Sequence, residues 1–229
     1  MEQTDLFNGS VTNYTLDKAD RLTGIQHSAV GQTLADYQYT LDNNGNRIKA
    51  VVEEPKKPEA LINRSQGHTY NAQKNRLLAT QLNGTTQATF SYDHEGRQQN
   101  KNSTNFTFDR AHRLIQRGND QYVYDGTGNR IRATRSGTTT KYIYDAAGNL
   151  LAEVNNSNQI TRYYIYGHGL IGFVDASTNQ LYTYHFDGTG HTVAITNQNR
   201  QIVNSYAYDT YGRLMAESET IPQPFKYAG

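Results

Sequence analysis

Aromatic and polar residues alternate along this chain in short runs that end in an aspartate followed by a glycine. The run "KYIYDAAGNLL", residues 141–151, places two tyrosines around one apolar residue and continues with Asp, two small residues, Gly and Asn. Residues two apart on a β-strand point to the same face of a sheet, so each run predicts a strand that presents a pair of rings to one side. The aspartate and glycine that follow predict a tight turn.

The pattern recurs eleven times when the chain is aligned on the aspartate position. The aligned positions are Asp17, Asp42, Asn71, Asp93, Asp109, Asp125, Asp145, Gly167, Asp187, Asp209 and Ala228. The residue three before this position is aromatic in ten units and the residue one before it in nine, so these slots hold 19 of the 25 aromatic residues. Each unit predicts a strand, a turn and a second strand, and the series predicts an all-β, antiparallel meander of hairpins.

The units from residue 121 onward follow the pattern most closely, and we assign their repeat residues a structural role. The aspartate is expected to accept hydrogen bonds from backbone amides of the turn, and the glycine to adopt a positive φ. A four- or five-residue hairpin loop around a type I turn fits the spacing. The assigned residues are Tyr122, Tyr124, Asp125, Gly128, Tyr142, Tyr144, Asp145, Gly148, Tyr164, Tyr166, Tyr184, Phe186, Asp187, Gly190, Tyr206, Tyr208, Asp209 and Gly212.

After the glycine the sequence takes two forms. In one form an arginine and an apolar residue follow, as in Arg113 and Leu114; in the other an asparagine is inserted, as in Asn129, Arg130 and Ile131. A one-residue slip would move the apolar side chain to the other face of the sheet. We therefore expect the turn to absorb the extra residue as a bulge, with the asparagine in a left-handed conformation.

The composition supports a core built largely from tyrosine. Leu, Ile, Val and Phe together number 43 of 229 residues, whereas tyrosine alone numbers 18. Tyrosine packs through its ring and keeps a hydroxyl that requires a partner, so the core should be thin, partly wet and hydrogen-bonded. The net charge of +1 gives no field that would attract nucleic acid or an anionic membrane. Cysteine is absent, no apolar run is long enough to span a bilayer, and residues 1–10 lack the features of a signal peptide.

The motifs "YVYDGTGNRI", "YIYDAAGNLL", "HFDGTGHTVAITN", "YAYDTYGRL" and "PFKYAG" resemble the YD repeat of the RHS family. This family includes bacterial RHS toxins, the C components of insecticidal toxin complexes, wall-associated proteins and the animal teneurins. The resemblance implies a meander that coils into a spiralling β-sheet, which in bacterial members forms a hollow shell around a variable C-terminal toxin. It also implies a secreted or cell-surface bacterial protein, whose export signal would lie outside this sequence.

The resemblance also implies the domain organisation. Residues 1–229 are expected to form a single array of about eleven units, and residues 167–229 resemble the start of the core segment that follows the repeats in this family. The charged stretch "EEPKKPE", residues 53–59, predicts an exposed loop or insertion. Many family members cleave themselves with aspartates of an Asp-Pro-rich motif, but no Asp-Pro dipeptide occurs here, so we assign no autoproteolytic residues. Eleven units are expected to form an open, curved sheet.

The repeat pattern also accounts for the candidate ligand groups. His185 is expected to face outward between two aromatic residues, and His191 to follow a turn glycine, so neither predicts a metal site. The stretch "DNNGN" at Asp42 resembles a calcium loop but has Arg47 where the sixth position requires glycine. Catalytic, cofactor-binding and metal residues are therefore all assigned as none. The arginines are expected to pair with aspartates or to pack over tyrosine rings.

The leading hypothesis is a non-enzymatic fragment of an RHS shell, whose partners are the rest of the shell and its enclosed toxin in the same polypeptide. The alternative is a surface adhesion module that binds glycans through exposed rings such as Tyr163 or Tyr182. A third class, an enzyme, would need carboxylates from distant units in one pocket. Unpaired sheet edges predict self-association. Neither a nucleic-acid partner nor a membrane span is predicted.

Overall fold

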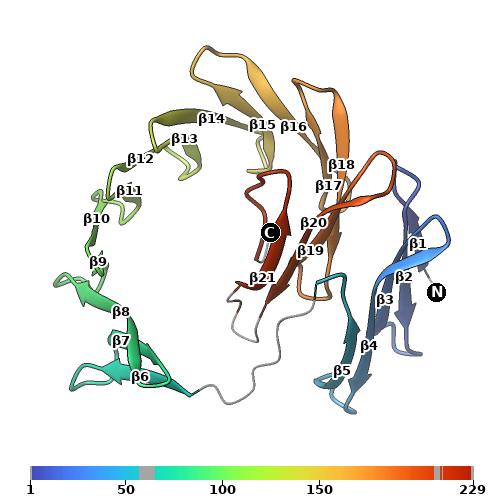
Figure 1. Ribbon diagram of the computed structural model, residues 1–229, viewed down its shortest axis with the longest axis horizontal. Helices are drawn as coiled ribbons and strands as arrows, with labels where there is room; N and C mark the ends of the chain where they lie inside the picture. The colour runs from blue at the N-terminus through green and yellow to red at the C-terminus, as the bar shows by residue number, and fades with distance from the viewer. Residues whose placement is uncertain (1, 57–64, 209–211, 213, 228–229) are drawn as a thin grey trace. The chain divides into compact units, whose positions relative to one another are not determined.

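The regular structure of the chain consists entirely of β-strands. The computed structural model describes residues 2–56, 65–208, 212 and 214–227, and it contains 21 strands in this part of the chain (Figure 1). Strands β1–β5 form one sheet and strands β6–β21 a second, and in both the strands are ordered as in the sequence. The predicted all-β antiparallel meander is confirmed. Its curved, spiralling course stays a prediction.

The described chain divides into two compact units. Met1–Ala60 and Arg162–Gly229 together form the first, here called the sandwich unit, and Leu61–Thr161 form the second, here called the single-layer unit. The first sheet of the sandwich unit contains β1 (Glu2–Asp5), β2 (Val11–Leu16), β3 (Leu22–Ala29), β4 (Gln32–Leu41) and β5 (Arg47–Glu53). Its other strands are β16 (Ile160–Tyr166), β17 (Leu170–Asp175), β18 (Gln180–Phe186), β19 (Thr192–Asn197), β20 (Ile202–Tyr208) and β21 (Leu214–Glu219).

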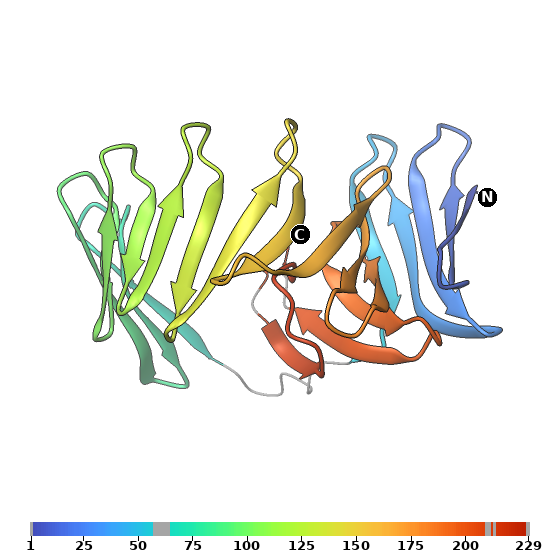
Figure 2. The ribbon, with the colours of Figure 1, turned by 90° about the horizontal axis from the view of Figure 1, so that it is seen from above.

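Two layers of sheet pack face to face in the sandwich unit. Ile25 and Tyr37 of the first sheet form a buried cluster with Val193 of β19. The side chain of Asn8, in the β1–β2 turn, donates a hydrogen bond to Thr196 Oγ1 of β19 over 2.9 Å. Figure 2 shows the first sheet beside the strands near the C-terminus of the described chain. Both faces of β18 and β19 are consequently covered, and their burial is nearly continuous rather than alternating.

The single-layer unit is a succession of short hairpins with a thin core. Its strands are β6 (Gln66–Tyr70), β7 (Leu77–Leu82), β8 (Thr85–Tyr92), β9 (Gln98–Lys101), β10 (Thr104–Phe108), β11 (Leu114–Arg117), β12 (Asp120–Tyr124), β13 (Arg130–Arg135), β14 (Thr138–Tyr144) and β15 (Leu150–Asn155). Tyr122 and Tyr142 are buried on one face, whereas Ile143 between the rings of its hairpin is exposed on the other. This agrees with the thin, tyrosine-based core that the composition predicts.

The predicted loop at residues 53–59 lies partly outside the described residues. Glu53 is the last residue of β5, and residues 54–56 form no strand. Residues 57–59 are not described. The organisation of residues 1–229 as one array, and the assignment of residues 167–229 to the start of a core segment, stay predictions.

Candidate functional site

The repeat turn is closed by its aspartate through side chain and backbone together. Asp125 Oδ1 accepts hydrogen bonds from the amides of Thr127 and Asn129, each over 2.9 Å. The Asp125 amide donates to the Asn129 carbonyl, and the Gly128 amide donates to the Asp125 carbonyl. The loop between Asp125 and Asn129 therefore holds three residues, whereas we predicted four or five. Three residues are enough because a type I turn followed by one left-handed residue already reverses the strand.

The other assigned turn residues lie in similar positions, with two exceptions. Asp145 and Asp187 each accept hydrogen bonds from the amides two and four residues later. The Gly167 unit forms a tighter turn, in which the Gly167 amide donates to the Gly169 carbonyl. Asp209 lies outside the described residues. Left-handed φ values between 80° and 97° occur at the assigned glycines Gly128, Gly148, Gly190 and Gly212.

Hydrogen bonds of this kind favour the ionised form of Asp17 and Asp145. The Arg21 side chain, hydrogen-bonded to Asp17, is the main cause that lowers the pKa of Asp17 to about 2. The pKa of Asp145 is also below its usual value, first because the Asn149 side chain donates to its carboxylate. A carboxylate held in this way is an acceptor for amide protons, which suits a turn and not a general acid.

The strand pairing after the turn differs from what we expected for units with the inserted asparagine. Arg130 pairs with Tyr124 across the hairpin in the same register as Leu114 pairs with Phe108 in its own unit. Both turns are thus equally long, although only one contains the inserted asparagine. Asn129 is not among the described residues with positive φ. The predicted left-handed asparagine is therefore wrong for this unit. A register shift of the kind a bulge produces does lie beside the turn, between Val123 and Tyr124, but the Leu114 unit has the same shift between Thr107 and Phe108, so this shift does not absorb the inserted residue.

Arginine takes the inward position in this form of the unit. The Arg130 guanidinium lies over the rings of Tyr122 and Tyr142, with its Cζ at 5.6 and 5.4 Å from their centroids. Ile131 lies on the strand beyond it and is among the exposed apolar residues. A cation over an aromatic ring can replace a leucine here because the arginine stem is apolar.

The Asn71 unit does absorb its extra residue. The Asn71 amide donates to the carbonyl of Arg76, one residue further than in the other turns, and Tyr70 pairs with Leu77. Lys74 adopts a φ of 55° at the position of the turn glycine. The expected longer turn is thus found in the unit whose sequence departs furthest from the pattern.

The two aromatic slots have different surroundings. The first-slot tyrosines that we assigned are buried: Tyr122, Tyr142, Tyr164, Tyr184 and Tyr206. The second-slot residues are half-buried: Tyr124, Tyr144, Tyr166, Phe186 and Tyr208. The hydroxyl of Tyr124 donates to the Leu114 carbonyl over 2.8 Å, and that of Tyr144 to the Arg130 carbonyl over 3.0 Å. Second-slot hydroxyls therefore tie these hairpins to the one before.

Arginines pair with the turn aspartates and cover rings, as predicted. Arg113 Nε donates to Asp109 Oδ2 over 2.8 Å, and its guanidinium lies 5.2 Å from the ring centroid of Tyr124. Arg97 forms the same ion pair with Asp93 at 2.6 Å. These cations are engaged within the repeat itself.

A second set of turns, at the opposite ends of the hairpins, was missed. Asn155 Oδ1 accepts hydrogen bonds from the amides two and four residues later, and Asn197 does the same. The residues three positions on, Asn158 and Arg200, have φ values of 63° and 64°. The signal was present in the related strings "NNSNQ" and "NQNRQ", which place an Asn-to-Gln spacing of four between two strands. Asparagine thus closes these turns as aspartate closes the others.

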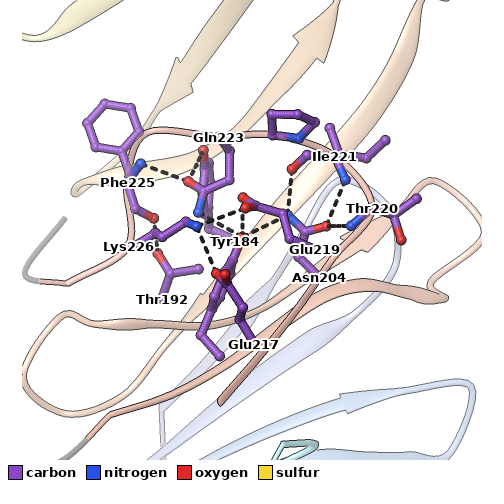
Figure 3. A network of polar contacts seen from close by, with 12 residues as sticks. Tyr184, Thr192, Asn204, Glu217, Glu219, Thr220, Ile221, Gln223, Phe225 and Lys226 are labelled. Atoms are coloured by element: carbon purple, nitrogen blue, oxygen red, sulfur yellow. Dashed lines mark hydrogen bonds and ion pairs between the residues drawn. The ribbon is translucent and has the colours of Figure 1, made fainter. Parts of the chain in front are cut away.

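The C-terminal strap, defined as residues 220–227, crosses the tyrosine face of the sandwich unit and is held by buried side chains (Figure 3). Asn204 Oδ1 accepts from the amides of Thr220 and Ile221 over 2.9 and 3.0 Å. Asn204 Nδ2 donates to the Ile221 carbonyl over 2.7 Å and to the Tyr206 hydroxyl over 2.8 Å. Sequence reasoning missed Asn204, although an asparagine within a strand is unusual enough to mark it.

The strap continues through a second group of contacts around Tyr206. Its hydroxyl donates to Glu219 Oε1 over 2.8 Å and accepts from Gln223 Nε2 over 3.0 Å. Lys226 Nζ lies 2.8 Å from a Glu219 oxygen and 3.0 Å from one of Glu217, as Figure 3 shows. Burial is the first cause that raises the pKa of the Tyr206 hydroxyl, so the hydroxyl stays protonated and can donate. The group links β20, β21 and the strap.

The two histidines near Asp187 do not form a metal site. His185 points away from its neighbouring rings as expected, but the predicted outward exposure is wrong, because the first sheet covers that face and leaves His185 1% exposed. His191 stacks on Tyr227 with ring centroids 4.1 Å apart. The Asp42 carboxylate accepts from Asn46 and lies in a turn like the others. Among the described residues no group of three His, Cys, Asp or Glu side chains could hold a metal ion.

One of the two rings considered for glycan binding is buried. Tyr182 is 7% exposed because it stacks on Phe173 at 4.9 Å between centroids. Tyr163 is 46% exposed. The prediction of an exposed ring is thus wrong for Tyr182 and correct for Tyr163. No helix in the described chain is long and apolar enough to cross a membrane.

Comparison with known proteins gives matches over most of the chain. A family described as "Teneurin YD-shell" matches residues 12–201. A tRNA nuclease WapA of Bacillus subtilis strain 168 is 28% identical over 203 residues, and a tRNA3(Ser)-specific nuclease WapA of Bacillus spizizenii is 27% identical over 205. Each alignment covers 84% of this chain and 8% of the relative, so the chain spans about a twelfth of these proteins.

Solved structures show the same fold. The crystal structure of TcdB2-TccC3-TEV matches 97% of this chain and 16% of its own, with a TM-score of 0.67 and 15% identity. The crystal structure of TcdB2-TccC3 without its hypervariable C-terminal region matches 99% of this chain and 16% of its own, with a TM-score of 0.50 and 16% identity.

Proposed function

The chain belongs to the teneurin YD-shell family, and from this premise we propose that it is a non-enzymatic wall segment of a β-shell that encloses and delivers a toxin domain of the same polypeptide. The observation that carries the proposal is the family match over residues 12–201, along which the same side-chain-closed turn recurs. A wall needs a repeating unit that joins its neighbours on both sides. The aspartate turns join the two strands of each unit, and the tyrosine hydroxyls join one hairpin to the hairpin before it.

The nuclease activity named for the relatives is assigned to another part of such a polypeptide. The matched segment is only 8% of those proteins, and the carboxylates described here are held as turn acceptors. One related complex, TcdB2-TccC3, was solved without its hypervariable C-terminal region, and a region of this kind is the cargo that we propose for the shell. We accordingly place the protein outside the cell or at its surface, with the rest of the shell and its cargo as partners.

Glycan binding is the weaker alternative. The rings that would recognise a sugar are mostly engaged: Tyr182 stacks on Phe173, and Arg130 covers Tyr122 and Tyr142. A glycan-binding face would need such rings free for stacking. The packing therefore supports a wall rather than a lectin.

The test uses the whole polypeptide that contains this chain. Limited trypsin digestion measures how fast the C-terminal domain of this polypeptide is cleaved. The digestion is carried out once with the natural array and once with Gly128 and Gly148 both replaced by valine. We expect the C-terminal domain to survive in the natural protein and to be cut rapidly in the variant, because a β-branched residue at a positive φ is strained and two such substitutions destabilise neighbouring turns. Replacing Gly126, which has no positive φ, by valine is the matched control. Equal cleavage of all three proteins would contradict enclosure.

A further inference from the structure

Two histidines, one from each layer, meet inside the sandwich unit. His27 lies on β3 and His185 on β18, and their ring centroids are 5.0 Å apart with an angle of 69° between the planes. The side chains belong to residues that are 3% and 1% exposed. Histidine is the side chain whose charge ordinarily changes near pH 6.5, so two of them in contact at a buried interface form a feature that a static wall does not require.

The hydrogen bonds of His27 define its neutral form. Its Nε2 lies 2.8 Å from the Phe186 carbonyl oxygen, which can only accept, so Nε2 carries the proton. Its Nδ1 lies 2.9 Å from Thr12 Oγ1 and, in the neutral ring, accepts from that hydroxyl. Both ring nitrogens of neutral His27 are thus satisfied, and the bond to Phe186 joins the two layers directly.

The hydrogen bonds of His185 are incomplete. Its Nε2 lies 3.0 Å from Thr196 Oγ1, an oxygen that also accepts from Asn8 Nδ2. Its Nδ1 is buried and has no hydrogen-bond partner. A protonated His185 would carry an N–H donor on both nitrogens, and one of them would face no acceptor. A buried donor without an acceptor is costly, and a charged one more so.

Among the described residues, the hydrogen bonds of the two rings go to threonine hydroxyls and a backbone carbonyl, and none goes to a carboxylate. Besides His185, Tyr37 is a titratable neighbour of His27, at 6.5 Å between ring centroids, and its hydroxyl donates to Glu54 over 3.0 Å. Asp187 follows Phe186 and uses its carboxylate to close its own turn. Burial lowers the pKa of His27, and burial followed by the charge of His27 lowers the pKa of His185 well below its usual value.

We propose that the His27–His185 contact is an acid-sensitive latch, which holds the β1–β5 sheet on β18 and β19 at neutral pH and releases it when the rings are protonated. This goes beyond the wall function, because it makes one part of the fold conditional on pH. Two positive rings 5.0 Å apart would repel one another, and no carboxylate of the described residues forms a hydrogen bond with either ring. Opening of the layers restores water to both rings.

The direction of the pH dependence follows from linkage. Above pH 6.5 both rings are neutral in the closed and open forms, so the latch is at full strength. As the pH falls below this value, the open form takes up protons that the closed form refuses, and the open form gains population. Glu54 acts in the opposite direction, since burial raises its pKa and the closed form accepts its proton more readily.

The test is hydrogen exchange of the intact chain at pH 7.5 and 5.5, corrected for the intrinsic exchange rates. We expect the opening constant of β3 and β18 to rise by about tenfold or more, because two groups titrate on opening. The single variants His27→Gln and His185→Gln should each weaken this dependence, and the double variant should lose it. His94→Gln, at an exposed position of the single-layer unit, is the control and should behave as the natural protein.

Two results would overturn the proposal. One is equal protection of β3 and β18 at both pH values; the other is a double variant that keeps the full pH dependence. NMR titration of the natural chain gives an independent answer if a variant fails to fold. Both buried rings must titrate below the ordinary histidine value of about 6.5, and a normal titration of either ring in the folded protein rules the latch out.

Discussion

At the scale of single residues, the fold depends on side chains that close their own turns. Asp125 bonds two amides within four residues of itself, and Asn155 does the same at the other end of its hairpin. The residue three positions after the turn aspartate or asparagine must adopt a left-handed backbone conformation, which glycine accepts without steric cost. Aspartate, asparagine and lysine also occupy this position in other turns, so glycine is favoured but not indispensable.

Two glycines of one turn test this dependence directly. Gly128 has a φ of 97°, whereas Gly126 in the same turn does not have a positive φ, and a side chain at either would meet no neighbouring atom within 4 Å. We expect Gly128→Ala to lower the free energy of unfolding by about 1–2 kcal/mol, the cost of a left-handed residue with a Cβ. Gly126→Ala should be neutral or stabilising by up to about 1 kcal/mol. Urea denaturation of both variants measures the difference, and equal effects would contradict the turn assignment.

At the scale of strands, register decides which of two neighbouring residues enters the core. Leu150 and Leu151 are adjacent on β15, and Leu150 pairs with Tyr144 directly after the turn. Successive side chains on a strand point to opposite faces, and Leu150 is buried whereas Leu151 is exposed. The arrangement explains why Ile131 is exposed while Arg130 lies inside.

The paired leucines give a prediction for this register. Leu150 is 8% exposed and Leu151 39%. Leu150→Ala should cost about 2–3 kcal/mol, because it leaves a cavity under the rings. Leu151→Ala should cost less than about 1 kcal/mol. Chemical denaturation distinguishes the two, and a reversed order would mean that the register is shifted by one residue.

The strap gives a second prediction at this scale. Asn204 is fully buried and makes four hydrogen bonds, three of them to the strap. Asn204→Ala should destabilise the sandwich unit by about 3 kcal/mol, because it leaves backbone groups of the strap unsatisfied. Limited proteolysis should then cut within residues 220–227. The exposed turn residue Asn199 is the control, and its alanine variant should resist protease as the natural chain does.

The sequence predicts local features well and packing between sheets poorly. Asp125 and Gly128 are readable because their hydrogen bonds lie within five residues. The inward position of Arg130 is not readable, because a pattern of polar and apolar residues does not record that a guanidinium can replace a leucine above a ring. The burial of His185 depends on a sheet 158 residues earlier in the chain at His27, and alternation within one strand contains no information about such a partner.

At the scale of the whole molecule, the two units differ in how they bury their strands. In the sandwich unit the first sheet covers one face of β18 and β19 and the strap crosses the other, whereas the single-layer unit relies on rings, arginine stems and hydroxyl bonds on one face. In the described chain β5 ends the first sheet, and Ile48, Val51 and Val52 on it are exposed. An apolar edge strand of this kind is a template for pairing with another strand.

We therefore expect the isolated chain to self-associate through β5. Sedimentation velocity should show larger species as the protein concentration rises, and Val51→Lys should shift the distribution toward monomer, because a charge on an edge opposes strand addition. Leu151→Lys adds the same charge at an exposed position inside a sheet and should leave the distribution unchanged. A chain that stays monomeric at all concentrations would contradict the expectation.

The turn closed by its own side chain has a consequence for the gene. Because each turn of the Asp125 kind carries its folding instruction within five codons, recombination between similar repeats can add or remove a whole hairpin without disturbing the turns that remain. An array built in this way can change its length in a single genetic event. Lineages should therefore differ by whole hairpins more often than by partial ones.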